Sequence, residues 1–225
     1  MNPKERAARS AVANVRSGQV LGLGTGSTAR EALQVLAQRI RDEGLDVVGV
    51  PTSELTQYEA EQLGIPLTTL DEHPVLDLAF DGADQVDARL ACIKGYGGAL
   101  LREKIVARCA RRLLIMVDAS KLAETLNKAV PVEVLPFGAA AARRELETLG
   151  GEPHLRLRND EPYVTDNGNH IFDVEFGRID APGDLSARIT GLPGVVDHGL
   201  FVDLIDELHV GDSDSARVIR RTRGA

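Results

Sequence analysis

Short runs of consecutive apolar residues alternate with amphipathic stretches over the first half of the chain. Apolar runs bounded by turn residues predict strands at Val20–Leu23, Val47–Val50, Leu76–Phe80 and Leu113–Val117. Between them, Arg30–Glu43 and Leu101–Arg111 have the spacing of amphipathic helices. Because the strands are apolar throughout, both faces of their sheet should be covered. The pattern therefore predicts βαβ units in an α/β fold with a parallel sheet, whose ligands bind beyond the carboxyl ends of the strands.

The alternation of apolar runs with amphipathic stretches changes near Lys128. A strand is expected at Val130–Leu135 and a helix at Phe137–Leu149, followed by short strands at Pro153–Arg158 and Tyr163–Thr165. A further strand is expected at His170–Phe176, a helix at Leu185–Ile189 and a last strand near Val195. This βαββαβ order predicts a small α+β domain over residues 129–198. The last apolar stretch, Leu200–Val210, is expected to return to the main sheet, so that residues 1–128 and 199–225 form the α/β domain around an insertion.

The composition of the chain limits which binding partners and which cellular compartment are expected. With 34 acidic and 26 basic residues, the chain has a net charge of -8, which works against binding to nucleic acid or to anionic membranes. The basic tail Arg217–Arg223 is expected to be a frayed, solvated terminus without a function. No apolar run approaches the roughly 20 residues of a membrane span. The two cysteines, Cys92 and Cys109, lack CxxC spacing and the five histidines are scattered, which favours a cytoplasmic protein without a metal site.

The first candidate site is the glycine-rich segment Gly22–Thr28, which follows a predicted strand and precedes a predicted helix. Free N–H groups at the helix start, with the hydroxyls of Thr25, Ser27 and Thr28, can bind an oxyanion such as phosphate. Dinucleotide binding would require GxGxxG, but Ser27 occupies the third glycine position. A phosphate subsite is the favoured interpretation, and a plain strand-to-helix turn is the alternative.

The second and third candidates each contribute acidic or basic groups. Asp81–Asp84, the sequence DGAD, follows an apolar strand and supplies two carboxylates for proton transfer, although Asp and Gly also build ordinary turns. Further on, Lys94 can stabilise a negative oxygen, and Glu103 can carry a proton between adjacent carbons. Taken alone, Glu103 is better explained as a carboxylate that offsets the dipole at a helix start, since such glutamates are common.

A fourth candidate, Lys121, ends the segment DASK after another predicted strand and taken alone would be a surface residue. All four candidates lie at strand exits or in the adjoining loops, where α/β proteins bind their ligands. Chance placement of four such groups is less probable than a single site.

Eight segments together resemble the ribose-5-phosphate isomerase A family, in the same order and over nearly the whole chain. They are GTGSTA at Gly24–Ala29, TSELT at Thr52–Thr56, DGAD at Asp81–Asp84, KGYGGALLREKI at Lys94–Ile105, DASK at Asp118–Lys121, PVEVLP at Pro131–Pro136, DNGN at Asp166–Asn169 and PGVVDHGLF at Pro193–Phe201. The resemblance implies a doubly wound, mainly parallel sheet domain with a smaller inserted ferredoxin-like α+β domain. It also implies a homodimer or homotetramer that uses no cofactor or metal.

The resemblance further implies interconversion of ribose 5-phosphate and ribulose 5-phosphate through an enediolate. Glu103 would be the general base, Asp81 and Asp84 would assist ring opening, and Lys94 would stabilise the enediolate. Residues expected to contact the sugar phosphate are Thr25, Gly26, Ser27, Thr28, Asp81, Gly82, Ala83, Asp84, Lys94, Gly95, Tyr96, Gly97 and Lys121, with Lys4 as a further phosphate partner. The reaction serves the non-oxidative pentose phosphate pathway and carbon fixation, and the sequence is compatible with both.

Two positions depart from the family pattern, and three other kinds of function are alternatives to the isomerase. Gln85 stands where glutamate is usual, and Tyr96 stands in a loop that is usually KGGG, where the backbone angles are expected to suit glycine better than tyrosine. Related folds also carry out sugar-phosphate deamination and coenzyme A transfer. A sugar-phosphate sensor without catalysis would keep the phosphate loop but could dispense with Glu103 or Lys94. An assembly subunit would explain none of the site residues.

Overall fold

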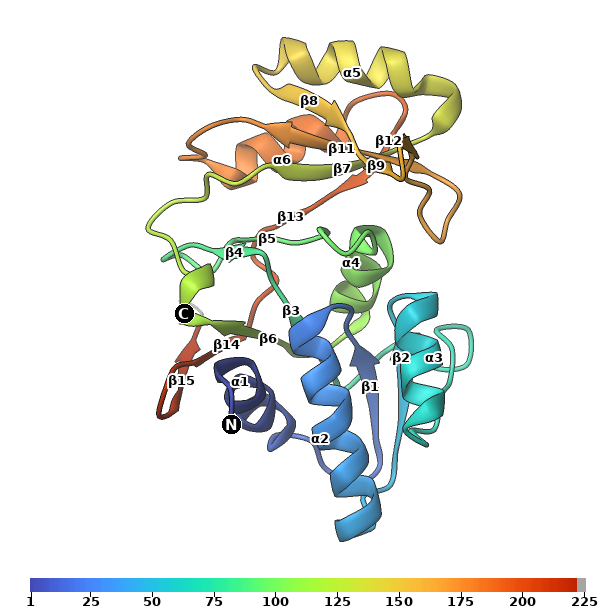
Figure 1. Cartoon of the computed structure of the whole chain (residues 1–225), viewed down its shortest axis with the longest axis vertical. Helices are drawn as coiled ribbons and strands as arrows, with labels where there is room; N and C mark the ends of the chain where they lie inside the picture. Colours follow the sequence, from blue (N-terminus) through green and yellow to red (C-terminus); the bar gives the residue numbers. More distant parts are fainter. Residues whose placement is uncertain (222–225) are drawn as a thin grey trace. The chain divides into compact units, whose positions relative to one another are not determined.

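The apolar runs of the first half form most of a six-stranded sheet in the computed structural model, which describes residues 1–221 (Figure 1). Its strand order is β15-β14-β6-β3-β1-β2, with β1 at Gln19–Leu23, β2 at Val47–Pro51, β3 at Leu78–Gly82, β6 at Leu113–Asp118, β14 at Glu207–Gly211 and β15 at Ala216–Arg220. Every neighbouring pair is parallel except β14 and β15. The predicted α/β fold with a mainly parallel sheet is confirmed. Of the last apolar stretch, only the part within β14 returns to this sheet, whereas Leu200–Phe201 is a strand of another sheet.

Four helices accompany this sheet: α1 at Pro3–Val12, α2 at Ser27–Glu43, α3 at Glu54–Gln62 and α4 at Leu100–Cys109. α1 is capped at its N-terminus by Asn2, whose side chain accepts a hydrogen bond from the N–H of Glu5, and α2 is followed by Gly44 in the left-handed conformation. α1 and α2 pack on one another and on the sheet, and they bury a common apolar core with β1, β3 and β6. Within residues 1–221, no helix is long and apolar enough to cross a membrane.

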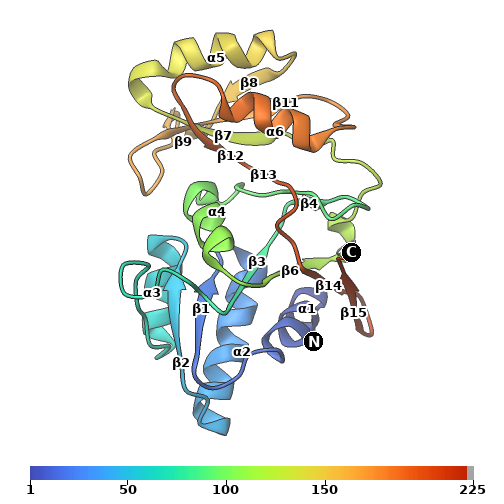
Figure 2. The same cartoon turned by 180° about the vertical axis from the view of Figure 1, so that it is seen from behind.

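The second half forms a four-stranded antiparallel sheet with two helices (Figure 2). The elements are β7 at Val130–Val134, α5 at Ala139–Thr148, β8 at Glu152–Leu155, β11 at His170–Glu175, α6 at Pro182–Thr190 and β12 at Val195–His198. The order β12-β7-β11-β8 and the βαββαβ connection are those of a ferredoxin-like fold, as expected. Its own core gathers residues from β7, β11, α5 and α6.

Shorter elements complete the chain. β4 at Gln85–Val86, β5 at Cys92–Ile93 and β13 at Leu200–Phe201 form a three-stranded sheet, and β9 at Leu157–Arg158 pairs with β10 at Glu161–Pro162. Short 3-10 helices lie at Ala119–Lys121 and Pro136–Gly138.

Two expectations about secondary structure are wrong. The strand predicted at Tyr163–Thr165 is absent, because the N–H of Thr165 turns back to the carbonyl of Asn169 at 2.9 Å and its hydroxyl donates to Glu133 at 2.9 Å. The basic tail is not frayed over Ala216–Arg220, which pairs along its length with β14. The end of that predicted tail, from residue 222, lies outside the described residues.

By internal contacts the chain divides into two compact units. Unit 1 comprises Met1–Ala83, Arg102–Lys121 and the chain from Leu204, and unit 2 comprises Asp84–Leu101 and Leu122–Asp203. Unit 2 thus contains the ferredoxin-like fold together with β4, β5 and β13. The boundaries predicted at residues 128/129 and 198/199 delimit the inserted βαββαβ segment alone and stay a prediction.

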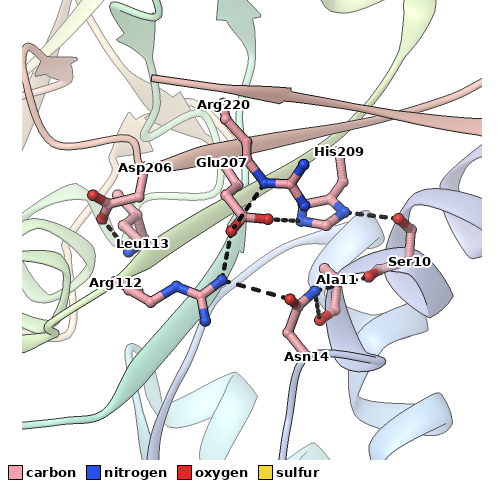
Figure 3. Close-up of polar contacts among 9 residues, drawn as sticks. All are labelled: Ser10, Ala11, Asn14, Arg112, Leu113, Asp206, Glu207, His209 and Arg220. Carbon is pink, nitrogen blue, oxygen red and sulfur yellow. Dashed lines mark hydrogen bonds and ion pairs between the residues drawn. The ribbon is translucent and has the colours of Figure 1, made fainter. Parts of the chain in front are cut away.

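A buried polar cluster in unit 1 joins the last strands to α1 (Figure 3). His209, on β14, is only 1% exposed, and its Nδ1 lies 2.8 Å from the hydroxyl of Ser10 on α1. Its Nε2 lies 3.5 Å from Glu207, which also pairs with Arg112 at 2.5 Å and Arg220 at 3.7 Å. Burial lowers the pKa of His209 to about 4; Glu207 opposes this shift, and Arg220 and Arg112 add to it. The imidazole is therefore neutral at pH 7.

This cluster predicts a loss of stability in mild acid. The pKa of His209 falls from an ordinary 6.5 to about 4, so between these values the unfolded chain binds more protons than the folded one. The free energy of unfolding should therefore decrease as the pH falls through this window, by roughly 3 kcal/mol for this group. Urea unfolding of the wild type and of His209→Gln between pH 7 and pH 4 measures the effect. The variant should show the shallower pH dependence, and equal slopes would contradict the prediction.

Candidate active site

The predicted site residues are distributed over both units. Unit 1 holds Thr25, Gly26, Ser27, Thr28, Asp81, Gly82, Ala83, Glu103 and Lys121, and unit 2 holds Asp84, Lys94, Gly95, Tyr96 and Gly97. The DGAD motif is thus divided after Ala83.

In unit 1, the glycine-rich segment meets Asp81 at the carboxyl ends of β1 and β3. A Cβ added to Gly24 would lie 2.2 Å from Oδ1 of Asp81, so only glycine allows this approach. The same oxygen accepts hydrogen bonds from the N–H of Thr25 at 3.1 Å and from the N–H of Gly82 at 2.7 Å. Asp81 is 4% exposed. Two predicted segments that are distant in sequence are therefore brought together, with the Asp81 carboxylate held by main-chain donors.

The hydroxyl of Thr25 contacts a cluster of other hydroxyl groups. Its Oγ1 lies 2.8 Å from Oγ1 of Thr52, 2.9 Å from Oγ of Ser53 and 2.9 Å from Oγ1 of Thr56. Thr56 also donates to the carbonyl of Gly24 at 3.0 Å. Both the N–H and the hydroxyl of Thr25 thus have protein partners, and they tie the loop to α3. The hydroxyl cluster after β2 was not assigned a function from the sequence, although TSELT was part of the family resemblance.

The start of α2 presents positive potential next to this loop. Gly26, with φ 111°, precedes the helix, and the first turn of the 17-residue helix contains no acidic residue. The first N–H groups of a helix have no partner within it, and its dipole favours anions there. Lys4, on α1, donates to the hydroxyl of Ser27 at 2.9 Å. An ammonium group and a helix N-terminus therefore converge beside Ser27.

Lys121 and Lys4 share an acidic neighbour at the end of β6. Burial works against ionisation of Asp118, but hydrogen bonds from Ser120 and the charges of Lys121 and Lys4 outweigh it and lower the pKa of this carboxyl. Asp118 also receives the N–H of Ser120 at 3.0 Å. The charges of two lysines from separate segments therefore act on one carboxylate at this strand end.

Glu103 lies in the first turn of α4 and is only 4% exposed. α4 packs closely on β1, because a Cβ added to Gly22 would lie 2.4 Å from Cγ1 of Val106. A glutamate that merely offset a helix dipole would ordinarily be solvated, since carboxylates are rarely buried without a specific environment. Burial of Glu103 favours a functional carboxylate.

In unit 2, Asp84 and the glycine loop, defined as Lys94–Gly98, are joined directly. The N–H of Tyr96 donates to Oδ2 of Asp84 at 3.1 Å, and the carbonyl of Asp84 accepts from Nζ of Lys128 at 3.2 Å. Lys94 is 3% exposed, its N–H donates to the carbonyl of Gly199 at 2.9 Å, and its Nζ lies 5.5 Å from the ring centre of Phe201. The lysine is thus fixed at both its main chain and its ammonium group.

The two departures from the family pattern fit without strain. The positive φ angles of the glycine loop belong to Gly95, at 105°, and Gly98, at 85°, so Tyr96 does not require a glycine conformation. Its hydroxyl donates to the carbonyl of Ala129 at 3.2 Å, and burial together with the charges of Asp84 and Asp173 raises its pKa to about 12. Gln85 exchanges hydrogen bonds with Asn127, at 2.7 and 2.8 Å.

Within residues 1–221, no three His, Cys, Asp or Glu side chains are grouped so as to hold a metal ion. What the described site does contain is carboxylates, lysines and main-chain N–H groups at strand ends. These features and the fold define the class of α/β enzymes that act on small anionic substrates.

Comparison with known proteins gives the family. A sequence profile of ribose 5-phosphate isomerase A (phosphoriboisomerase A) matches residues 48–215. Ribose-5-phosphate isomerase A of Methanosarcina acetivorans is 48% identical over 99% of this chain and 96% of its own length, and that of Gloeobacter violaceus is 52% identical over 96% and 95%. The chain belongs to the ribose 5-phosphate isomerase A family, a family of isomerases.

Solved structures agree. Ribose 5-phosphate isomerase A from Methanocaldococcus jannaschii superposes with a TM-score of 0.93 and 42% identity, covering 97% of this chain and 98% of that one. A D-ribose-5-phosphate isomerase in complex with phospho-erythronic acid superposes with a TM-score of 0.94 and 37% identity, covering 98% and 100%. The doubly wound α/β fold with a ferredoxin-like α+β part is therefore shared over 97–98% of this chain.

Proposed function

We propose that this protein interconverts D-ribose 5-phosphate and D-ribulose 5-phosphate, with Glu103 as the general base. The observation that carries the proposal is that unit 1 contains both a phosphate-type helix start beside Lys4 and a buried carboxylate at Glu103. Family membership supports the substrate, and so does the phosphorylated sugar acid bound by a structure that superposes along the whole chain.

In the proposed reaction, Glu103 removes the proton from carbon 2 of the open-chain aldose. The electron pair of that C–H bond forms the carbon–carbon double bond of an enediolate, and the carbonyl oxygen on carbon 1 becomes the oxyanion. Glu103 then returns the proton to carbon 1. The proton of the hydroxyl on carbon 2 is transferred to the oxyanion on carbon 1, so that carbon 1 carries a hydroxyl and carbon 2 becomes the ketose carbonyl. One carboxylate serves both transfers, and no electron leaves the substrate.

The other predicted residues divide the remaining tasks. Lys94 and the N–H groups of the glycine loop oppose the charge of the enediolate oxygen. Asp81 and Asp84 accept and return protons on the sugar oxygens during ring opening. The helix start at Gly26–Thr28, with Lys4 and Lys121, holds the phosphate. This division is consistent with Thr25 serving the loop structure through its hydroxyl cluster.

The test is isomerisation of ribose 5-phosphate by the purified wild-type protein in the presence of a chelator. We expect ribulose 5-phosphate to appear with the chelator present, because no step of the proposed mechanism uses a metal. A folded protein that binds ribose 5-phosphate without converting it would be a sensor and would overturn the proposal.

We also propose a cytoplasmic homodimer or homotetramer. The family resemblance of the sequence motifs supplies the expectation of an oligomer, and two cysteines without CxxC spacing are compatible with a reducing compartment. Light scattering coupled to size-exclusion chromatography determines the number of subunits, and a monomer at micromolar concentration would contradict this part of the proposal.

A further inference from the structure

Arg156, between β8 and β9 of unit 2, reaches the main chain of the glycine loop. Its Nη1 donates to the carbonyl of Gly95 at 2.9 Å and to that of Tyr96 at 3.3 Å. Gly95 also accepts the N–H of Gly98 at 3.0 Å. Two successive carbonyls held by one charged donor fix the orientation of the peptide between them. The guanidinium therefore holds the loop immediately after Lys94.

Asp173 fixes the plane of that guanidinium. Its carboxylate accepts Nε of Arg156 at 2.9 Å and Nη2 at 2.5 Å, which is the two-point geometry of an arginine–carboxylate pair. The side chain of Arg156 is only 14% exposed. Asp173 lies on β11, which pairs with both β7 and β8, so the carboxylate stands on an interior strand of the ferredoxin-like sheet. The loop is thereby connected to a rigid support.

Tyr163 packs against Gly98, the last residue of the glycine loop. A Cβ added to Gly98, where φ is 85°, would lie 2.1 Å from the hydroxyl oxygen of Tyr163, so the ring packs directly on the loop backbone. The guanidinium of Arg156 lies 5.9 Å from the centre of the same ring, as does that of Arg158 from β9. Tyr163 is thus in contact with both the loop and the arginine that holds it.

We propose that Arg156, oriented by Asp173, is a positioning residue for Lys94 in the isomerase reaction. The inference rests on the proposed function, in which Lys94 opposes the charge on the enediolate. The N–H of Lys94 donates to the carbonyl of Gly199, and Arg156 binds the carbonyls of the next two residues. These contacts on either side restrain the main chain from which the lysine side chain projects. Small misplacement of a group that acts in the transition state costs turnover more than substrate binding.

The test replaces each partner conservatively. Arg156→Lys keeps the charge but loses the planar fork, and Asp173→Asn keeps the shape but loses the charge. We expect kcat to fall by about 10- to 100-fold in each variant, the usual effect of misplacing a catalytic group. KM should stay within about threefold, because the proposed phosphate contacts are made by other segments. The double variant should be no slower than the slower single variant, since both act through one contact.

Amide hydrogen exchange separates positioning from simple stabilisation. In Arg156→Lys, exchange should accelerate at Tyr96 and Gly98, whose N–H groups bond Asp84 and Gly95, while the amides of β7 and β11 keep their protection. Arg158→Lys is the matched control, because Arg158 packs on the same ring from an exposed strand. It should leave kcat and loop exchange unchanged. A folded Arg156→Lys protein with kcat within twofold of the wild type, or an equal loss in Arg158→Lys, would overturn the proposal.

The two proposals can fail separately. A wild type that does not isomerise ribose 5-phosphate removes the proposed function. In that case loop exchange still decides whether Arg156 positions the loop. Unchanged exchange at Tyr96 and Gly98 in Arg156→Lys then refutes the positioning role.

Discussion

Glu103→Gln should lower kcat for ribose 5-phosphate isomerisation by roughly 10²–10⁴ and leave the protein folded. A positioned acid–base group contributes about this much to catalysis, and glutamine retains the shape of glutamate without accepting a proton. Because Glu103 is 4% exposed, removal of its charge should not unfold α4. Initial rates with ribose 5-phosphate, with circular dichroism on the same samples, measure both effects. In D2O, the variant should also lose incorporation of deuterium at the substrate carbons.

Glu54→Gln is the matched control for this prediction. Glu54 also lies in the first turn of a helix, α3, but its side chain is exposed. If Glu103 served only to offset a helix dipole, both substitutions would cost a few tenths to about 1 kcal/mol of stability and neither would affect turnover. Near-normal turnover of Glu103→Gln would exclude it as the base.

The main sheet could be predicted from the sequence because its strands are buried on both faces. β1, β2, β3 and β6 therefore appear as uninterrupted apolar runs between polar segments. α3 could not be predicted from the sequence, because most of its residues are not buried. Within Glu54–Gln62 it buries only Thr56 and Ala60, so it carries almost no apolar stripe. The two-residue strands β4, β5 and β13 are too short for any periodic pattern.

The candidate site was predicted in part, since its residues stand in motifs at strand ends. What the motifs could not give is the direction in which each polar group points. Thr25 is a hydroxyl in a phosphate-type loop, yet its hydroxyl is directed to the cluster of Thr52, Ser53 and Thr56. Arg156 belongs to no motif, because it acts on main-chain carbonyls that any residue could present. Such contacts depend on tertiary structure and leave little signal in a single sequence.

Gly24→Ala should reduce kcat/KM by about 10²-fold or more and also destabilise the protein. The new methyl group would lie 2.2 Å from Oδ1 of Asp81, well inside van der Waals contact, so either the loop or the carboxylate must move. Either shift breaks the hydrogen bond of 3.1 Å from the N–H of Thr25 to Asp81 and displaces a proposed catalytic carboxylate. Overpacking of this kind costs about 1–3 kcal/mol, which urea unfolding can measure.

Gly183→Ala separates this local effect from a general one. Gly183 lies in α6, where an added Cβ would have its nearest neighbour at 3.9 Å, so alanine should be tolerated or even stabilising there. Its kcat/KM should match that of the wild type. If Gly24→Ala retained activity within a few-fold, the close approach of the loop to Asp81 would not be needed for catalysis. Unfolding alone lowers kcat/KM only in proportion to the fraction of enzyme that remains folded. A larger loss of kcat/KM than that fraction explains would show that this contact sets the geometry of Asp81.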